Sequence, residues 1–166
     1  MVLMISCTQP KNIYDISRKG TVLELKLLFE KHPNQINTPN SNGYSPLVLA
    51  CYYNNKEVVS FLLENGADVN YNSGFGTPLM AAVVKNHQDI IVQLLQKNAD
   101  VNLSDESGTT ALHYATMFKN TNTIKLLTEA GADINRLDAQ NYSPLDYARN
   151  FKSIRVKGCE SNGISD

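Results

Sequence analysis

The sequence predicts an all-α solenoid of about five stacked helix-turn-helix units connected by β-hairpin loops. The first observation is a phrase that ends one helix, Leu-Leu followed by Gly-Ala-Asp-Val-Asn at residues 62–70, with near copies at 94–102 and 126–135. The second is its period, because Asp68, Asp100 and Asp133 lie 32 and 33 residues apart. A fixed period of this length indicates that each unit is one supersecondary structure stacked on its neighbours.

Residues 11–40 are expected to form the first unit, which caps the N-terminal end. Asn12 has the side chain of a helix N-cap, and the helix that it starts runs to about Lys19. A second helix follows, with apolar residues over a broad face. It ends at Pro33, because proline cannot continue a helix.

The three central units, 41–73, 74–105 and 106–138, repeat one plan. Each first helix begins after a hydroxyl residue, Ser45, Thr77 or Thr110, whose side chain satisfies free backbone amides of the first turn. Proline at the next position suits a helix start, because no amide is needed there. The expected helices span about 46–53, 56–64, 77–85, 88–96, 110–118 and 121–129.

Residues 139–166 are expected to form the C-terminal cap. Ser143 and Pro144 start its first helix, and residues 154–161 lie where its second helix belongs. That second segment carries charged residues in place of a leucine run. Polarity suits a terminal unit, because its outer face has no neighbour to cover it.

Composition excludes several classes of protein. The chain has 166 residues, 42% of them hydrophobic and 19% charged, with a formal net charge of −1. Such a chain is neither disordered by composition nor basic enough to indicate a nucleic-acid partner. No apolar run approaches the roughly 18 residues of a membrane span. We therefore expect no nucleic-acid partner and no transmembrane segment. We also expect the chain to be a monomer.

Residues that could carry chemistry are scattered. His32, His87 and His113 lie in different units, and Cys51 stands beside Ala50 on a packed helix. Equivalent residues of stacked units lie roughly 10 Å apart, so the repeated aspartates are too distant to share a metal ion. We expect no catalytic, cofactor-binding or metal-binding residues, and therefore no enzyme and no cofactor.

The combination of Gly-x-Thr-Pro-Leu-His-x-Ala with Leu-Leu-x-x-Gly-Ala-Asp-Val-Asn resembles the ankyrin repeat, from about Asn12 to the end of the chain. The resemblance implies L-shaped units in a curved solenoid that binds another protein. It also implies that His113 makes a structural hydrogen bond to the turn. Departures are Asn98 at a glycine position and Lys119 between two helices, where the family usually has glycine.

The resemblance implies a partner-binding surface on the concave side, formed by the hairpin tips and the exposed faces of the first helices. Aromatic and large apolar residues are frequent at these positions, and such residues are the usual anchors of protein interfaces. The expected partner-binding residues are Tyr44, Tyr52, Tyr53, Tyr71, Phe75, Val84, Met117, Phe118, Arg136 and Tyr142.

Residues 1–10 fit no repeat and are expected to be an N-terminal tail. Four apolar residues followed by Ser6 and Cys7 resemble the end of a bacterial lipoprotein signal, although the charged start and full apolar run of such a signal are missing. A cytoplasmic protein-binding module is expected. The alternatives are a lipid-anchored protein of the bacterial cell envelope or periplasm, with the anchor at Cys7, and an inhibitor or immunity-type protein that covers a partner enzyme's active site.

Overall fold

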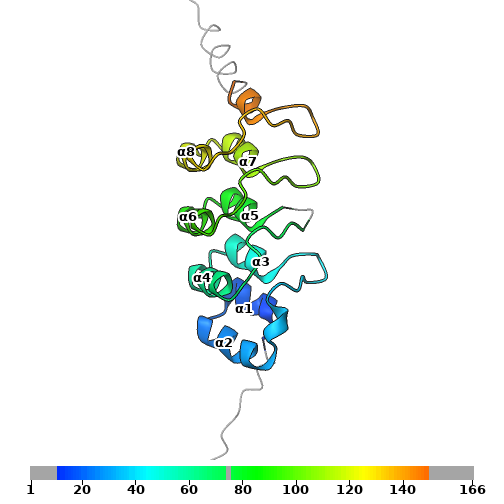
Figure 1. The fold of residues 1–166 in the computed structure, drawn as a ribbon, viewed down its shortest axis with the longest axis vertical. Helices are drawn as coiled ribbons and strands as arrows, with labels where there is room; N and C mark the ends of the chain where they lie inside the picture. Colours follow the sequence, from blue (N-terminus) through cyan, green and yellow to red (C-terminus); the bar gives the residue numbers. More distant parts are fainter. Residues whose placement is uncertain (1–10, 74–75, 150–166) are drawn as a thin grey trace, which may run out of the picture.

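The computed structural model describes residues 11–73 and 76–149, which form an elongated stack of helix pairs (Figure 1). An inner row of helices lies beside an outer row, and loops project from the inner row on the side away from the outer row (Figure 1). The inner row comprises α1 (Ile13–Lys19), α3 (Pro46–Tyr52), α5 (Pro78–Val84) and α7 (Ala111–Met117). The outer row comprises α2 (Val22–Lys31), α4 (Lys56–Glu64), α6 (Gln88–Gln96) and α8 (Thr121–Glu129). A 3-10 turn, η1 (Pro33–Gln35), follows α2, and a further helix occupies 144–149.

Helix starts follow the local chemistry of the sequence. Ser45, Thr77 and Thr110 accept hydrogen bonds from backbone amides of α3, α5 and α7, and prolines follow the first two. The inner helices end one residue earlier than the predicted 53, 85 and 118, whereas α4, α6 and α8 have the predicted bounds. The second helix predicted for the last unit, 154–161, lies outside the described residues.

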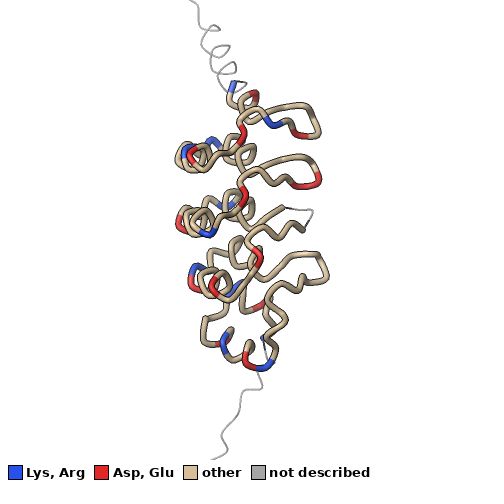
Figure 2. The backbone as a smooth tube through the Cα atoms, in the orientation of Figure 1, with Lys and Arg blue, Asp and Glu red and all other residues tan. Residues whose placement is uncertain are grey.

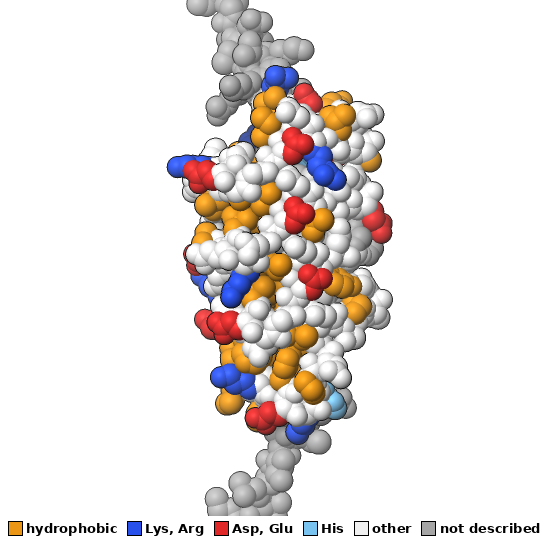
Figure 3. Space-filling model, in the orientation of Figure 1, with side chains coloured by type: hydrophobic (Ala, Val, Ile, Leu, Met, Phe, Trp, Pro, Cys, Tyr) orange, Lys and Arg blue, Asp and Glu red, His pale blue; other side chains and the backbone are white. Residues whose placement is uncertain are grey.

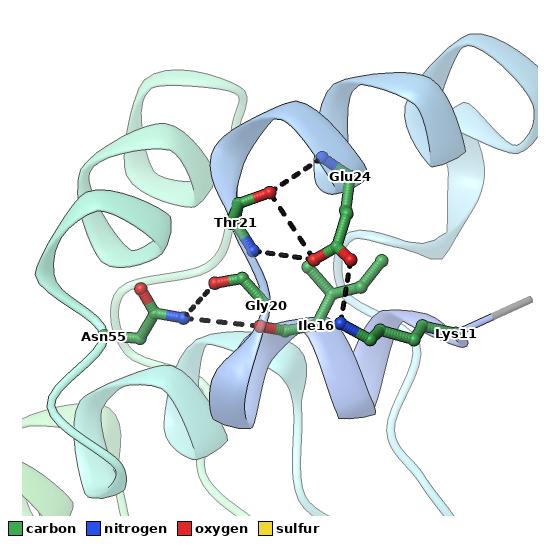
Figure 4. Close-up of polar contacts among 6 residues, drawn as sticks. All are labelled: Lys11, Ile16, Gly20, Thr21, Glu24 and Asn55. Carbon is green, nitrogen blue, oxygen red and sulfur yellow. Dashed lines mark hydrogen bonds and ion pairs between the residues drawn. The ribbon is translucent and has the colours of Figure 1, made fainter. Parts of the chain in front are cut away.

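The first helix pair is tied to the second repeat by polar contacts (Figure 4). The Thr21 hydroxyl accepts from the Glu24 amide, and the Glu24 carboxylate accepts from the Thr21 amide and from Lys11 Nζ at 2.8 Å. Asn55, at the start of α4, donates from Nδ2 to the Gly20 carbonyl at 2.8 Å and to the Ile16 carbonyl at 3.3 Å. The last two bonds fix the N-terminal cap against its neighbour.

A second set of hydrogen bonds joins successive repeats through the turns that follow the outer helices. Asn37 Oδ1 accepts from the Asp68 amide, and Asn102 Oδ1 accepts from the Asp133 amide, each at 2.8 Å. The Asp68 carboxylate in turn accepts from the amide two residues later, as does that of Asp133. The repeated aspartates therefore serve as turn caps, and acidic residues recur along the stack in Figure 2.

The core is continuous along the stack. Leu62, Leu94 and Leu127 of the outer row are completely buried, and so are the small residues Cys51 and Ala82, where neighbouring inner helices meet. Burial raises the pKa of the Cys51 thiol, so this residue packs as a small apolar group.

The loops have hairpin shape but little sheet. One isolated antiparallel bridge, between Ser104 and Thr110, is the only β pairing in the described part of the chain. Asp105 and Asp138 instead organise their loops through Oδ1, which accepts from the amides two and four residues later. The loops are thus fixed mainly by turn chemistry.

Candidate functional site

A hollow of about 430 Å³ lies between the loops and the inner row. Its walls come from α1, α3, α5 and α7 and from the loop before α3. Four of the predicted partner-binding residues line it: Tyr44, Tyr52, Tyr53 and Val84. Concave sites of about 300–1,000 Å³ with apolar walls are typical of binding sites, and this one is formed by four consecutive repeats.

Tyr52 and Tyr53 form the most exposed aromatic pair of the hollow. Their rings pack edge to face with centroids 5.2 Å apart, yet the residues remain 40% and 46% exposed. Lys85 Nζ lies 4.4 Å from the centroid of the Tyr52 ring, within the range of a cation–π contact. The Tyr52 carbonyl is also 3.2 Å from His87 Nε2, which fixes the end of α3 against the next repeat.

The positions of these residues follow from helix geometry. Residues three, four, seven and eight after the N-cap share one face of a helix, and for Ser45 these are Val48, Leu49, Tyr52 and Tyr53, which all line the hollow. The sequence interpretation identified only the later pair. Helical spacing carried the signal for the earlier pair and for their counterparts in α5, Met80 and Ala81, which also line the hollow.

Tyr114 closes one end of the hollow from α7 and was also missed. Its hydroxyl donates to Asp105 Oδ2 at 2.6 Å, and its ring stacks on Phe118 with centroids 6.5 Å apart. Burial, together with the hydrogen bond to Asp105, raises the pKa of Tyr114 to about 12. Tyr114 therefore stays neutral and fixed in place at physiological pH.

Arg18, at the end of α1, lies at the opposite side and had no sequence motif to mark it. Its Nη1 is 3.7 Å from Asp15 Oδ1, which is the long end of ion-pair distance. Its Nε is buried and donates to no acceptor among the described residues. A guanidinium group carries five N–H donors, and the side chain of Arg18 is 37% exposed, so its accessible donors can serve a ligand in the hollow.

The remaining predicted residues are placed differently. Met117 and Phe118 are 38% and 56% exposed at the end of α7, but they do not line the hollow. Tyr71 is half-buried, and its hydroxyl donates to the Gly43 carbonyl at 2.9 Å, which joins neighbouring loops. Phe75 and Cys7 lie outside the described residues, so their predicted roles stay predictions.

The last two predicted residues lie after α8, in the segment that leads to the helix at 144–149. Arg136 is exposed, and Tyr142 is 44% exposed with its ring 5.7 Å from that of Tyr147. The Tyr142 carbonyl lies 3.1 Å from Nε2 of the buried His113, whose Nδ1 accepts from the Thr110 amide at 3.1 Å. His113 therefore makes the structural bond to the turn that the sequence predicts, and it also joins the last two repeats.

No group of three or more His, Cys, Asp and Glu side chains converges as a metal site within residues 11–73 and 76–149. Every helix found in the same residues is too short or too polar to cross a lipid bilayer. The face shown in Figure 3 carries hydrophobic side chains in patches between acidic ones.

Comparison with known proteins agrees with the stacked helix pairs. The sequence pattern described as ankyrin repeats (3 copies) matches residues 13–105 and again residues 79–156. The chain is 50% identical over 62 residues to an ankyrin repeat protein of Acanthamoeba polyphaga mimivirus, a match covering 36% of this chain and 6% of that protein. It is 37% identical over 57 residues to the DNA-binding protein RFXANK of Homo sapiens (34% of this chain, 22% of the relative). It is 40% identical over 50 residues to the ankyrin repeat and SAM domain-containing protein 6 of Rattus norvegicus (30% of this chain, 6% of the relative).

Each match spans under a quarter of the relative's length, whereas the family pattern covers most of this chain. The chain belongs to the ankyrin repeat family.

Proposed function

We propose that this chain is a non-enzymatic module that binds a partner protein through the hollow between the loops and the inner helices. Ankyrin repeats are in general protein-protein interaction modules. The observation that carries the narrower proposal is the exposed tyrosine pair, Tyr52 and Tyr53, at the wall of the hollow.

The physical reason is the cost of leaving such side chains in water. Large aromatic side chains are normally covered, and a group of them around a concave site marks an interaction surface. The hydroxyls of Tyr52 and Tyr53 can form hydrogen bonds with a partner, while the rings supply contact area at low entropic cost. Truncation of such an anchor typically costs about 2 kcal/mol or more of binding free energy.

A matched pair of variants tests the site. The full chain, immobilised, is used to capture proteins from cells of its source, in parallel with Tyr53→Ala and Val92→Ala. Val92 lies on α6 in the outer row and is 37% exposed, so its truncation removes apolar surface away from the hollow.

A partner that uses the hollow is retained by the wild-type chain and Val92→Ala, and lost or weakened at least about 10-fold by Tyr53→Ala. Equal retention by all three proteins would contradict the proposed site. The captured partner also tests the inhibitor alternative, since an inhibited enzyme regains activity when Tyr53→Ala replaces the wild-type chain.

A further inference from the structure

The charge around the hollow differs from that of the rest of the chain. The described residues that line the hollow include one cation, Arg18, and no aspartate or glutamate. The inner helices, taken with the two residues after each, carry four cations and one carboxylate: Arg18, Lys19, Lys85 and Lys119 against Asp15. Counted in the same way, the four outer helices carry five lysines and six carboxylates: Lys26, Lys31, Lys56, Lys97 and Lys125 against Glu24, Glu30, Glu57, Glu64, Asp89 and Glu129.

This separation gives the inner row a positive potential in a chain whose net charge is −1. The repeated aspartates follow α4, α6 and α8, and acidic residues form a column along the face shown in Figures 2 and 3. The cations of the inner row therefore favour an acidic ligand there over the outer row.

Within the hollow, Arg18 is the group best placed to receive a negative charge. It lines the hollow, its side chain is 37% exposed, and its Nε is a buried donor without an acceptor among the described residues. The exposed part of the guanidinium can donate to a ligand in the hollow, whereas the buried Nε is out of reach. Carboxylates suit the planar guanidinium because they accept two parallel hydrogen bonds.

Most of the remaining lining is apolar. Val48, Met80, Ala81 and Val84 line the hollow, and Tyr44 and Tyr52 add aromatic surface. The Lys85 ammonium group over the Tyr52 ring adds a second positive charge beside this lining. The hollow thus combines an apolar pocket with a cationic side, and a ligand needs both an apolar group and an acid to satisfy it.

We propose that the hollow recognises a short segment of a partner protein in which a bulky apolar side chain lies close to an aspartate or glutamate. The apolar side chain fills the space between Met80 and Tyr52, and the carboxylate accepts hydrogen bonds from Arg18. This inference rests on the proposed function and adds the chemistry of the bound segment.

A phage-displayed library of random dodecapeptides, selected on the immobilised full chain, provides the test. The expected result is enrichment of peptides with an acidic residue at a fixed spacing from a large apolar one. Selection is repeated on Arg18→Gln, Arg18→Lys, Tyr53→Ala and, as a charge-matched control away from the hollow, Lys97→Gln. Urea unfolding of each variant verifies that it retains the wild-type fold.

The best enriched peptide is then synthesised with its acid and with the matching amide. Replacement of the acid by the amide, or Arg18→Gln, is expected to weaken binding about 10-fold or more. The two changes together cost little more than either alone, because they remove the same interaction. Arg18→Lys keeps part of the affinity, and Lys97→Gln binds as the wild type does.

The outcomes separate this inference from the proposed function. Peptides that are apolar only, and that still depend on Tyr53, would overturn the acidic preference and leave the binding site in place. An acidic preference that persists in Arg18→Gln would overturn the role of Arg18. Failure to enrich any peptide that depends on Tyr53 would overturn both the inference and the proposed site.

Discussion

Lys119 provides a quantitative test of how the helix pairs are built. It follows α7 with φ of +57°, a left-handed conformation that costs a residue with a Cβ roughly 1–2 kcal/mol. The equivalent residue of the second repeat is Asn54, with φ of +61°, and asparagine adopts this conformation more easily. Replacement of Lys119 by glycine should therefore remove strain that replacement of Asn54 barely affects.

The expected magnitude is a difference between two effects. Glycine relieves about 1–2 kcal/mol of strain but increases the entropy of the unfolded chain, at a cost of about 0.4–1 kcal/mol. Relative to Lys119→Ala, Lys119→Gly is thus expected to raise the free energy of unfolding by about 0.5–1 kcal/mol. The midpoint of thermal unfolding should rise by about 1–4 °C for a chain of this size. The backbone bond from the Lys119 amide to the Thr116 carbonyl, at 2.9 Å, remains available to glycine.

Two controls separate strain from side-chain contacts. Lys119→Ala removes the long side chain and its interactions but keeps the Cβ, so it is the reference against which Lys119→Gly isolates the backbone strain. Asn54→Gly should change the free energy of unfolding by less than about 0.5 kcal/mol, because its strain relief and entropy cost nearly cancel. Urea denaturation followed by far-UV circular dichroism measures all three variants on the full chain. If Lys119→Gly is no more stable than Lys119→Ala, backbone strain at this residue is refuted.

Three further predictions concern the junctions between repeats. His113→Ala should lower the free energy of unfolding by about 2–4 kcal/mol, measured in urea, because it empties a fully buried site and leaves polar groups without partners. For Asp138, burial opposes ionisation, but hydrogen bonds led by that from the Tyr142 amide outweigh it and hold the pKa below the usual range. A lowered native pKa stabilises the fold above the unfolded pKa, about 3.9, and this contribution is lost as the pH falls through the native value. Urea midpoints at about pH 6 and pH 3 should therefore differ less for Asp138→Asn than for the wild type, and an equal difference would contradict this role. Gly20→Ala should cost about 1–3 kcal/mol in the same assay, since its Cβ would lie 2.5 Å from the Ile16 Cα, and a neutral effect would show that the backbone yields.

The helices could be predicted closely because their determinants are local and repeated. A hydroxyl cap, a proline after it and a left-handed residue at the end act within one turn, and each recurs in phase along the chain. Gly66, Asn98 and Gly131 all take positive φ, as the aligned phrases predict. The repeat period therefore fixed helix bounds to within about a residue, without any knowledge of distant contacts.

The binding surface could be predicted only in part, because it depends on how repeats stack. Tyr52, Tyr53 and Val84 were found from one face of each inner helix. Tyr71 was assigned to the same surface, but its hydroxyl reaches the Gly43 carbonyl of the preceding loop. Arg18 was missed for the complementary reason, because its place in the hollow depends on how the cap helix α1 packs against α3. The repeat period predicts the position of a residue within its own repeat, but it does not predict how far the side chain lies from residues of the neighbouring repeat.

The place of the hollow along the stack has a simple physical cause. The fourth residue after the N-cap is Leu49 in α3, Ala81 in α5 and Tyr114 in α7, and all three line the hollow. The small residue lies between two larger ones, so the surface is low at α5 and rises on both sides. In α7 the position equivalent to Val48 and Met80 is His113, which bonds the last repeat and does not line the hollow. The repeat that joins the C-terminal cap is therefore also the one at which the hollow ends, so the binding site spans the first four repeats.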